Sequence, residues 1–364
     1  MANYSTTARL DLDEIVELIT HTGTDITYLV RGEMGIGKSS METALVSQLT
    51  TLTGEDWHFI YFDCASMSDS ADLFIPFPDR DEGYFERLLS KRIAAYPESA
   101  NLVIMLDEFT KANRMVLQAL HTLLEKRKRL GDTDFQHGKI ISLATGNLNE
   151  EGVGDTLQAH TNDRVTEVEA KKPSAEKWLP WAADNGIDPP VMAWVYETPQ
   201  VLASFRDPDF DEDNAYVLNP KKVQRSVVTP RSLEKTSHIT KQRAHFSRDA
   251  LIAAITGTAG EPAARSLVNF IEFQDQLPSR EIILKSPDTA PIPDSSGAVI
   301  TLVFNLLSIV ERDTITPIMK YVRRLPAEQQ GVFCVNLAKH KTKSSIAFTN
   351  AEFTRWAQDN QDIL

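Results

Sequence analysis

A short stretch near the amino terminus has the residue types and spacing of a phosphate-binding loop. Residues 31–40 read RGEMGIGKSS and follow the apolar run ITYLV at 26–30. In such a loop, backbone N–H groups surround phosphate oxygens while a lysine neutralises them. A glycine turn beside a surface lysine is the alternative, but the full pattern is rare by chance. We therefore expect a nucleotide to contact Gly32, Glu33, Met34, Gly35, Ile36, Gly37, Lys38, Ser39 and Ser40.

An acidic pair, Asp107 and Glu108, ends the later apolar run LVIMLDE. If the loop holds ATP or ADP, a Mg²⁺ ion accompanies the phosphates, and this hard cation prefers oxygen ligands. Ser39 and Asp107 would hold the metal, and Glu108 would polarise the attacking water. Acidic pairs also simply end strands, but the phosphate loop upstream favours the chemical interpretation.

Strands and helices alternate through the first part of the chain. Strand candidates lie at 26–30, 58–63, 102–107 and 140–145, and helical patterns lie at 38–50 and 112–127. This alternation is typical of a parallel sheet covered by helices, and ligands bind such sheets beyond the carboxyl ends of the strands. We predict an α/β fold in which a three-layer αβα P-loop NTPase domain precedes a smaller all-helical lid domain.

The composition of the chain changes after about residue 170. We predict a nucleotide-binding core over 1–170 and helical lid and carboxyl-terminal helices over 229–364, where apolar stripes recur at helical spacing. The stretch between them, 171–228, is rich in proline, aspartate and asparagine. We interpret it as a connector with inserted loops.

Bulk composition narrows the function classes. A net charge of −13 argues against broad nucleic-acid binding by a basic face without excluding it. Two cysteines make no disulfide framework, and eight scattered histidines show no metal-like spacing. With no leader-like start and no apolar run long enough for a bilayer, we expect no membrane association and a cytoplasmic location.

The order of motifs resembles the AAA+ ATPases, in their MoxR-like or dynein-related branch. The pieces are GEMGIGKSS, VIMLDEFTKANRMVLQALHTLLEKRK, FQHGKIISLATGN, DTLQAHTNDRV and TPRSLEK, and the resemblance covers about residues 10–245. Beyond the first two pieces, the order is specific rather than any single motif. The resemblance implies the core and lid described above and an ATPase that works as a ring, expected to be hexameric.

The resemblance assigns roles to three further residues. Asn147 resembles the sensor-one residue at the end of its strand, although TGNLN is also good turn chemistry. Arg164 resembles the arginine finger that a neighbouring subunit supplies, the alternative being an ordinary surface arginine. Arg231 resembles sensor two, where Pro230 begins the first lid helix.

Two features depart from that branch. Leu148 stands where a proline commonly follows the sensor asparagine, and the segment after Cys64 is shorter than the usual insert, of which we interpret 72–85 as the remainder. A hairpin before sensor one is expected at 129–139.

The carboxyl-terminal region resembles bacterial and phage AAA+ proteins, which implies a bacterial or phage-infected host and a von Willebrand factor A-type partner.

These observations favour a magnesium-dependent ring ATPase that remodels or activates a protein partner. An ATP-gated scaffold with little turnover is the first alternative, and the intact acidic pair argues mildly against it. A DNA-associated motor is disfavoured by the acidic balance. A metabolite kinase would leave Arg164 and the helical lid without a role.

Overall fold

The computed structural model describes residues 8–97, 99–126, 128–130, 133–134, 138–148, 157, 159–272 and 277–361. The chain divides into two compact units, Met1–Lys172 and Pro173–Leu364. Across the described residues, none of the helices combines the length and the apolar character that crossing a bilayer requires.

The first unit is built on a six-stranded parallel sheet, which confirms the predicted fold class. The strand order is β1-β10-β2-β9-β6-β3, and every neighbouring pair is parallel. Four strands lie close to their predicted bounds, whereas β1 and β10 were not predicted. The strands are β1 (Arg9–Leu10), β2 (Tyr28–Arg31), β3 (Trp57–Asp63), β6 (Asn101–Asp107), β9 (Ile140–Gly146) and β10 (Thr166–Ala170).

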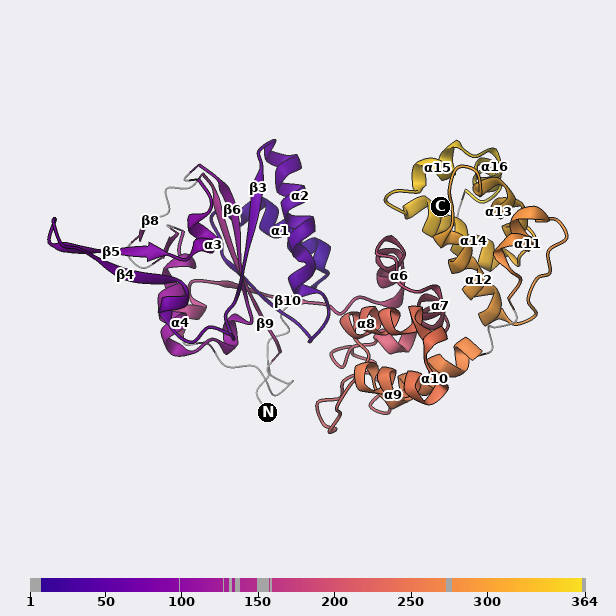
Figure 1. Cartoon of the computed structure of the whole chain (residues 1–364), viewed down its shortest axis with the longest axis horizontal. Helices are drawn as coiled ribbons and strands as arrows, with labels where there is room; N and C mark the ends of the chain where they lie inside the picture. The colour runs from indigo at the N-terminus through magenta and orange to yellow at the C-terminus, as the bar shows by residue number, and fades with distance from the viewer. Residues whose placement is uncertain are drawn as a thin grey trace. The chain divides into compact units, whose positions relative to one another are not determined.

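Helices cover both faces of this sheet, which gives the three layers. On one face α1 (Leu12–Thr22) and α2 (Met41–Thr53) pack on β2, β6 and β9 through one apolar cluster. On the other face α3 (Lys91–Ala94) and α4 (Arg114–Leu120) pack through a second cluster. Figure 1 shows the two helix pairs on opposite sides of the strands. Side chains alternate between the faces along each strand, so both faces must be apolar.

Short elements complete the first unit. The predicted helix at 112–127 is present as α4 followed by the 3-10 turn η4 (His121–Leu123), and the apolar face continues through it to Leu124. The other elements are the 3-10 turns η1 (Lys38–Ser40), η2 (Ser70–Asp72) and η3 (Phe109–Lys111) and the helical turn α5 (Ala159–Asn162).

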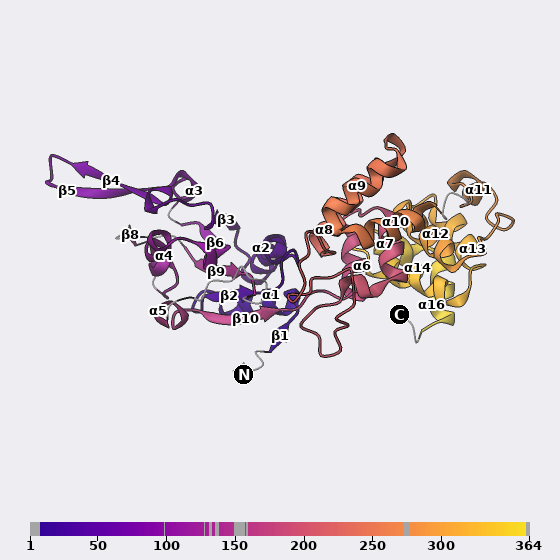
Figure 2. The same cartoon turned by 90° about the horizontal axis from the view of Figure 1, so that it is seen from below.

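Two antiparallel hairpins accompany the sheet. Residues 72–85, interpreted as a shortened insert, lie mostly in a hairpin of β4 (Phe74–Asp79) and β5 (Tyr84–Leu89). Figures 1 and 2 both show it projecting from the sheet. The expected hairpin at 129–139 is present in part: β7 (Arg129–Leu130) pairs with β8 (Thr133–Asp134), and 131–132 and 135–137 lie outside the described residues.

The second unit is helical, with no strand among its described residues. Its core gathers around α7 and α12, where Trp194 and Phe304 are nearly fully buried. The helices are α6 (Ala175–Asp184), α7 (Pro189–Glu197), α8 (Pro230–Lys241), α9 (Arg248–Ala259), α10 (Glu261–Glu272), α11 (Arg280–Lys285), α12 (Ser296–Ser308), α13 (Ile315–Val322), α14 (Ala327–Lys339), α15 (Ser344–Thr349) and α16 (Ala351–Asp359).

The segment 171–228 differs from the predicted connector with loops. Its first part forms α6 and α7, whose Trp178 and Val191 belong to the core of the second unit. Proline is tolerated at a helix start, as in α7, and burial of these large side chains outweighs the cost of Pro180 inside α6. Residues 203–229 contain turns and neither helix nor strand, as expected for inserted loops.

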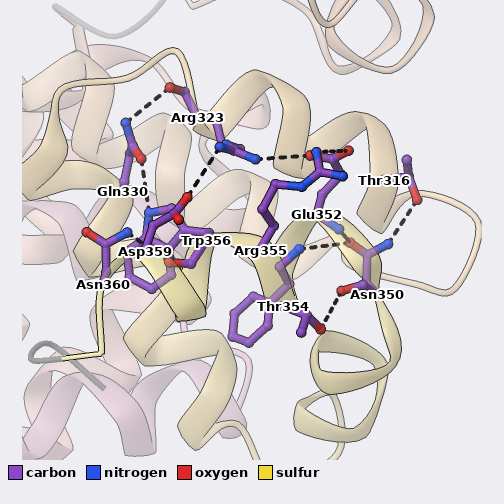
Figure 3. A network of polar contacts seen from close by, with 11 residues as sticks. Thr316, Arg323, Gln330, Asn350, Glu352, Thr354, Arg355, Trp356, Asp359 and Asn360 are labelled. Atoms are coloured by element: carbon purple, nitrogen blue, oxygen red, sulfur yellow. Dashed lines mark hydrogen bonds and ion pairs between the residues drawn. The ribbon is translucent and has the colours of Figure 1, made fainter.

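A polar network joins the last helices of the second unit (Figure 3). Arg323 follows α13, and its guanidinium lies 3.3 Å from Glu352 and 3.7 Å from Asp359 on α16. Gln330 on α14 donates to the Arg323 carbonyl (3.1 Å) and accepts from Trp356 Nε1 (3.0 Å). The side chains of α16 thus fix it to α13 and α14.

A buried histidine predicts that the stability of the second unit depends on pH. His340 Nδ1 lies 3.1 Å from Asp184 Oδ1, and the ring is 8% exposed. Burial lowers the pKa of His340, Asp184 raises it and Lys343 lowers it, leaving the pKa below its ordinary value. The unfolded chain then binds more protons just below about pH 6.5, so we expect the free energy of unfolding to fall as pH drops through that window.

Denaturant unfolding at pH 7.5 and pH 5.5 measures this effect. The variant His340→Gln should lose part of the pH dependence. His238→Gln, at an exposed position on α8, should keep it. Equal pH dependence in both variants would contradict the assignment.

Candidate nucleotide site

The phosphate loop connects β2 to η1 and α2, with two glycines in the left-handed region. Gly35 has a φ of 70° and Gly37 a φ of 106°, which side chains rarely adopt. A Cβ on Gly32 would lie 2.7 Å from Ile36 Cδ1 and 3.1 Å from the Ala170 carbonyl. The loop therefore needs glycine at these three positions, where a side chain would add strain or a close contact.

Lys38 turns back across the loop that precedes it. Its Nζ donates to the carbonyls of Gly32 (2.6 Å) and Glu33 (2.9 Å) and to Asn147 Oδ1 (3.2 Å). The side chain is 8% exposed. An ammonium group held inside a ring of backbone is placed to meet a phosphate, which would replace some of these oxygens.

The other loop residues have distinct surroundings. Ile36 is buried in the cluster beneath α1 and α2, whereas Met34 is 38% exposed. Glu33 is buried. Ser40 Oγ donates to the Gly37 carbonyl at 2.7 Å and closes the turn into α2.

Asp107 ends β6 and is held by three hydroxyl groups. Ser39 Oγ (3.0 Å) and Tyr61 OH (2.7 Å) donate to its Oδ2, and Thr145 donates to its Oδ1. Burial raises the pKa of Asp107, but the hydrogen bonds from Thr145, Tyr61 and Ser39 outweigh it and hold the pKa below its ordinary value. The carboxylate is therefore ionised at neutral pH.

Tyr61 and Thr145 were not predicted as site residues. They stand on β3 and β9, the two neighbours of β6, near the carboxyl ends where Asp63 aligns with Asp107. A polar residue near the end of each strand was the available signal. The strand order needed to use that signal cannot be read from a single sequence.

Glu108 follows in a strained conformation. Its φ of 50° is the only positive value among the described non-glycine residues, a cost that usually persists only at functional positions. Its N–H donates to Thr145 Oγ1 (3.2 Å), and Lys111 Nζ lies 2.9 Å from its Oε2. Within the described part of the chain, Oε1 makes no hydrogen bond, so that oxygen is available to a water.

Asn147 lies just beyond the end of β9, beside the loop. Besides meeting Lys38 through its side chain, it accepts a hydrogen bond from Arg31 Nη1 at its carbonyl (3.2 Å). Leu148, at the position where the resemblance implies proline, is buried. The structure thus brings the loop lysine, the acidic strand end and this asparagine into one connected group.

Comparison with known proteins fits this geometry. The family model described as the AAA domain of the dynein-related subfamily matches residues 27–165. The matched segment is less than half of the chain and is similar to that family. The match confirms the predicted resemblance, and none of the curated proteins compared with the chain is significantly similar to it.

Several solved structures are similar at low identity. A candidate ATPase from Cytophaga hutchinsonii is 22% identical, with a TM-score of 0.33, and the alignment covers 48% of this chain and 50% of that one. NtrX from Brucella abortus in complex with ADP is 15% identical, with a TM-score of 0.41, over 97% of this chain and 67% of that one.

A RuvB variant from Thermotoga maritima is 14% identical, with a TM-score of 0.37, over 86% of this chain and 85% of that one. In the alignment with the Cytophaga protein, this chain spans half the length of that protein. Because these TM-scores are all below 0.5, we assign the fold from the strand order of the sheet and not from these similarities.

Arg164, near the end of the matched segment, lies apart from the loop contacts. Its Nε lies 3.2 Å from Glu125 Oε1, and its Nη1 donates to the His160 carbonyl at 2.6 Å. Its side chain is 32% exposed. Within this one chain the structure does not join Arg164 to Lys38 or Asp107, so its role at the nucleotide stays a prediction.

Arg231 belongs to the second unit. It is exposed in the first turn of α8, which Pro230 begins and Thr229 caps by accepting from the Ser232 N–H (3.0 Å). The expected helix start is present. The sensor-two role of Arg231 stays a prediction.

The left-handed glycine of the loop gives a direct test. At Gly37 a Cβ would add backbone strain of about 1–2 kcal/mol and lie 3.1 Å from Ser40 Oγ. We expect Gly37→Ala to weaken ATP binding about tenfold, measured by calorimetry. Gly54→Ala is the matched control, because Gly54 has a φ of 68° at the end of α2 and nothing within 4 Å of its Cβ position. Unchanged affinity of Gly37→Ala for ATP would contradict the assignment of this loop as the phosphate-binding site.

Proposed function

We propose that this chain is a magnesium-dependent AAA+ ATPase that works as a homo-oligomeric ring and remodels or activates a protein partner. The observation that carries the proposal is the connected group of Lys38, Ser39, Asp107 and Asn147 at the carboxyl edge of a parallel sheet. Ligands bind open α/β sheets at this edge.

Within one subunit, Lys38 and the loop N–H groups would bind the β- and γ-phosphates of ATP. Glu108, with Oε1 available, would take a proton from the attacking water. Asn147 would orient that water or the γ-phosphate. Lys111 keeps the Glu108 carboxylate in place from the other oxygen.

The residues around Asp107 suit a magnesium ion. Ser39 Oγ and Asp107 Oδ2 are 3.0 Å apart, and both are oxygen donors of the kind that Mg²⁺ prefers. When bound, Mg²⁺ would neutralise phosphate charge as hydrolysis proceeds. Because Asp107 is ionised at neutral pH, it needs no prior loss of a proton to serve as a ligand or to hold a ligand water.

Assembly would complete the site. Arg164 of one subunit would reach the nucleotide of the next, and Arg231 would act from the lid of the subunit that holds the nucleotide. The ring is expected to be hexameric and cytoplasmic, in a bacterial cell or a phage-infected host. The expected partner is a von Willebrand factor A-type protein, which rests on the resemblance of the carboxyl-terminal region.

Mixing two inactive variants tests this function. Arg164→Ala subunits keep their own catalytic group but supply no finger, and Glu108→Gln subunits supply the finger without a catalytic group. If the site is shared, the mixture should hydrolyse ATP faster than either variant alone. No recovery in assembled mixtures would contradict a shared site, and stimulation by DNA that salt abolishes would instead favour a motor.

A further inference from the structure

The guanidinium of Arg164 is held at two of its three nitrogens. Its Nε donates to Glu125 Oε1 (3.2 Å), and its Nη1 donates to the His160 carbonyl (2.6 Å). Among the described residues, nothing accepts a hydrogen bond from Nη2. Two sides of a planar fork are thus held while one terminal nitrogen remains open to a group from outside the chain.

Glu125 is itself well placed to hold this orientation. It follows Leu123 and Leu124, both buried in the cluster under α4, so its backbone is anchored to the core. Its second oxygen, Oε2, lies 3.6 Å from Arg129 Nη2. One carboxylate therefore lies between two guanidinium groups and faces the Arg164 Nε with a fixed backbone behind it.

Two histidines, which are neutral or positively charged, lie beside Arg164 and Glu125. His121 and His160 stack edge to face with centroids 5.1 Å apart. Burial lowers the pKa of His121, and the charges of Arg164 and His160 lower it further, while Glu125 raises it. Glu125 is the carboxylate that meets the charge of Arg164 in the described structure.

We propose that Glu125 is the positioning residue for Arg164, holding its open nitrogen toward the nucleotide of the neighbouring subunit. This inference rests on the proposed function, because it needs a site shared between subunits. An ion pair whose side chains are 32% and 34% exposed contributes little to the free energy of folding, so we assign it a role in orientation. A lock that sequestered the finger would engage both terminal nitrogens, which Glu125 does not.

The test places the variant on one side of the shared site at a time. Glu108→Gln subunits supply the finger to Arg164→Ala subunits, and the recovered ATPase rate is measured at saturating ATP. Adding Glu125→Gln to the finger-supplying subunit should lower that rate about tenfold, a fraction of the roughly 10³-fold or more that an arginine finger supplies. Adding it to the Arg164→Ala subunit should change nothing, because no finger is there to position.

Two readouts separate positioning from general damage. Assembly and melting temperature should be unchanged in both mixtures. Glu55→Gln in the finger-supplying subunit is the matched control, since Glu55 pairs with Lys139 at 2.8 Å in the same unit. It should leave the rate unchanged.

Each outcome bears on a different claim. An equal rate with and without Glu125→Gln in the finger-supplying subunit would overturn the proposal, and so would an equal loss from either side. Failure of the unmodified pair to recover any activity would overturn the proposed shared site, and the role of Glu125 with it.

Discussion

Replacing Glu108 with glutamine should stop ATP hydrolysis while leaving ATP bound. Glu108 is the strained residue after β6, and its Oε1 is open to a water. Glutamine has nearly the same shape but cannot accept a proton, so the loss should reach about 100-fold or more, as for removal of a general base. Steady-state phosphate release and ATP binding by calorimetry would be measured on the same preparation.

The control for Glu108→Gln is Glu17→Gln, which changes an exposed carboxylate on α1. It should hydrolyse ATP at the rate of the unchanged protein. Turnover by Glu108→Gln at that same rate would remove Glu108 from the catalytic role. Loss of binding along with turnover would instead mean that the carboxylate supports the loop.

Replacing Lys38 with methionine should remove ATP binding rather than catalysis alone. The ammonium group is buried against the loop, and a charged hydrogen bond to phosphate contributes about 1.5–3 kcal/mol. We expect the Kd for ATP to rise about 100-fold. Calorimetric titration with ATP and magnesium measures this directly.

Lys139→Met is the matched change for Lys38→Met. Lys139 is a half-exposed lysine in the same unit, paired with Glu55 at 2.8 Å. It should bind ATP normally. Normal binding by Lys38→Met would show that the phosphate lies elsewhere.

Local patterns predicted the central strands well because each is a continuous apolar run. β6 is buried along its whole length, because helices cover both faces of the sheet. Such a strand is apolar on both faces and reads as a continuous apolar run. β10 was missed because its TEVEA sequence carries two glutamates, one of them, Glu167, paired with Arg31 at 3.0 Å. Its strand character comes from pairing beside β2.

Residue spacing alone predicted the candidate site only where its residues are close in sequence, and Asn147 was predicted through the family resemblance. The loop glycines, Lys38 and Ser39 form one motif, and Asp107 and Glu108 form another. Tyr61 enters the site through strand order, a long-range property. The helices α6 and α7 were missed for a related reason, since burial of Trp178 and Trp194 favours helix over the local turn signals.

The rate of ATP hydrolysis per subunit, measured with magnesium across a wide range of protein concentration alongside particle mass, tests the central claim most directly. A site completed between subunits predicts a rate that rises as the mass rises and then saturates. A substantial rate that stays flat while the particles remain single chains would contradict it.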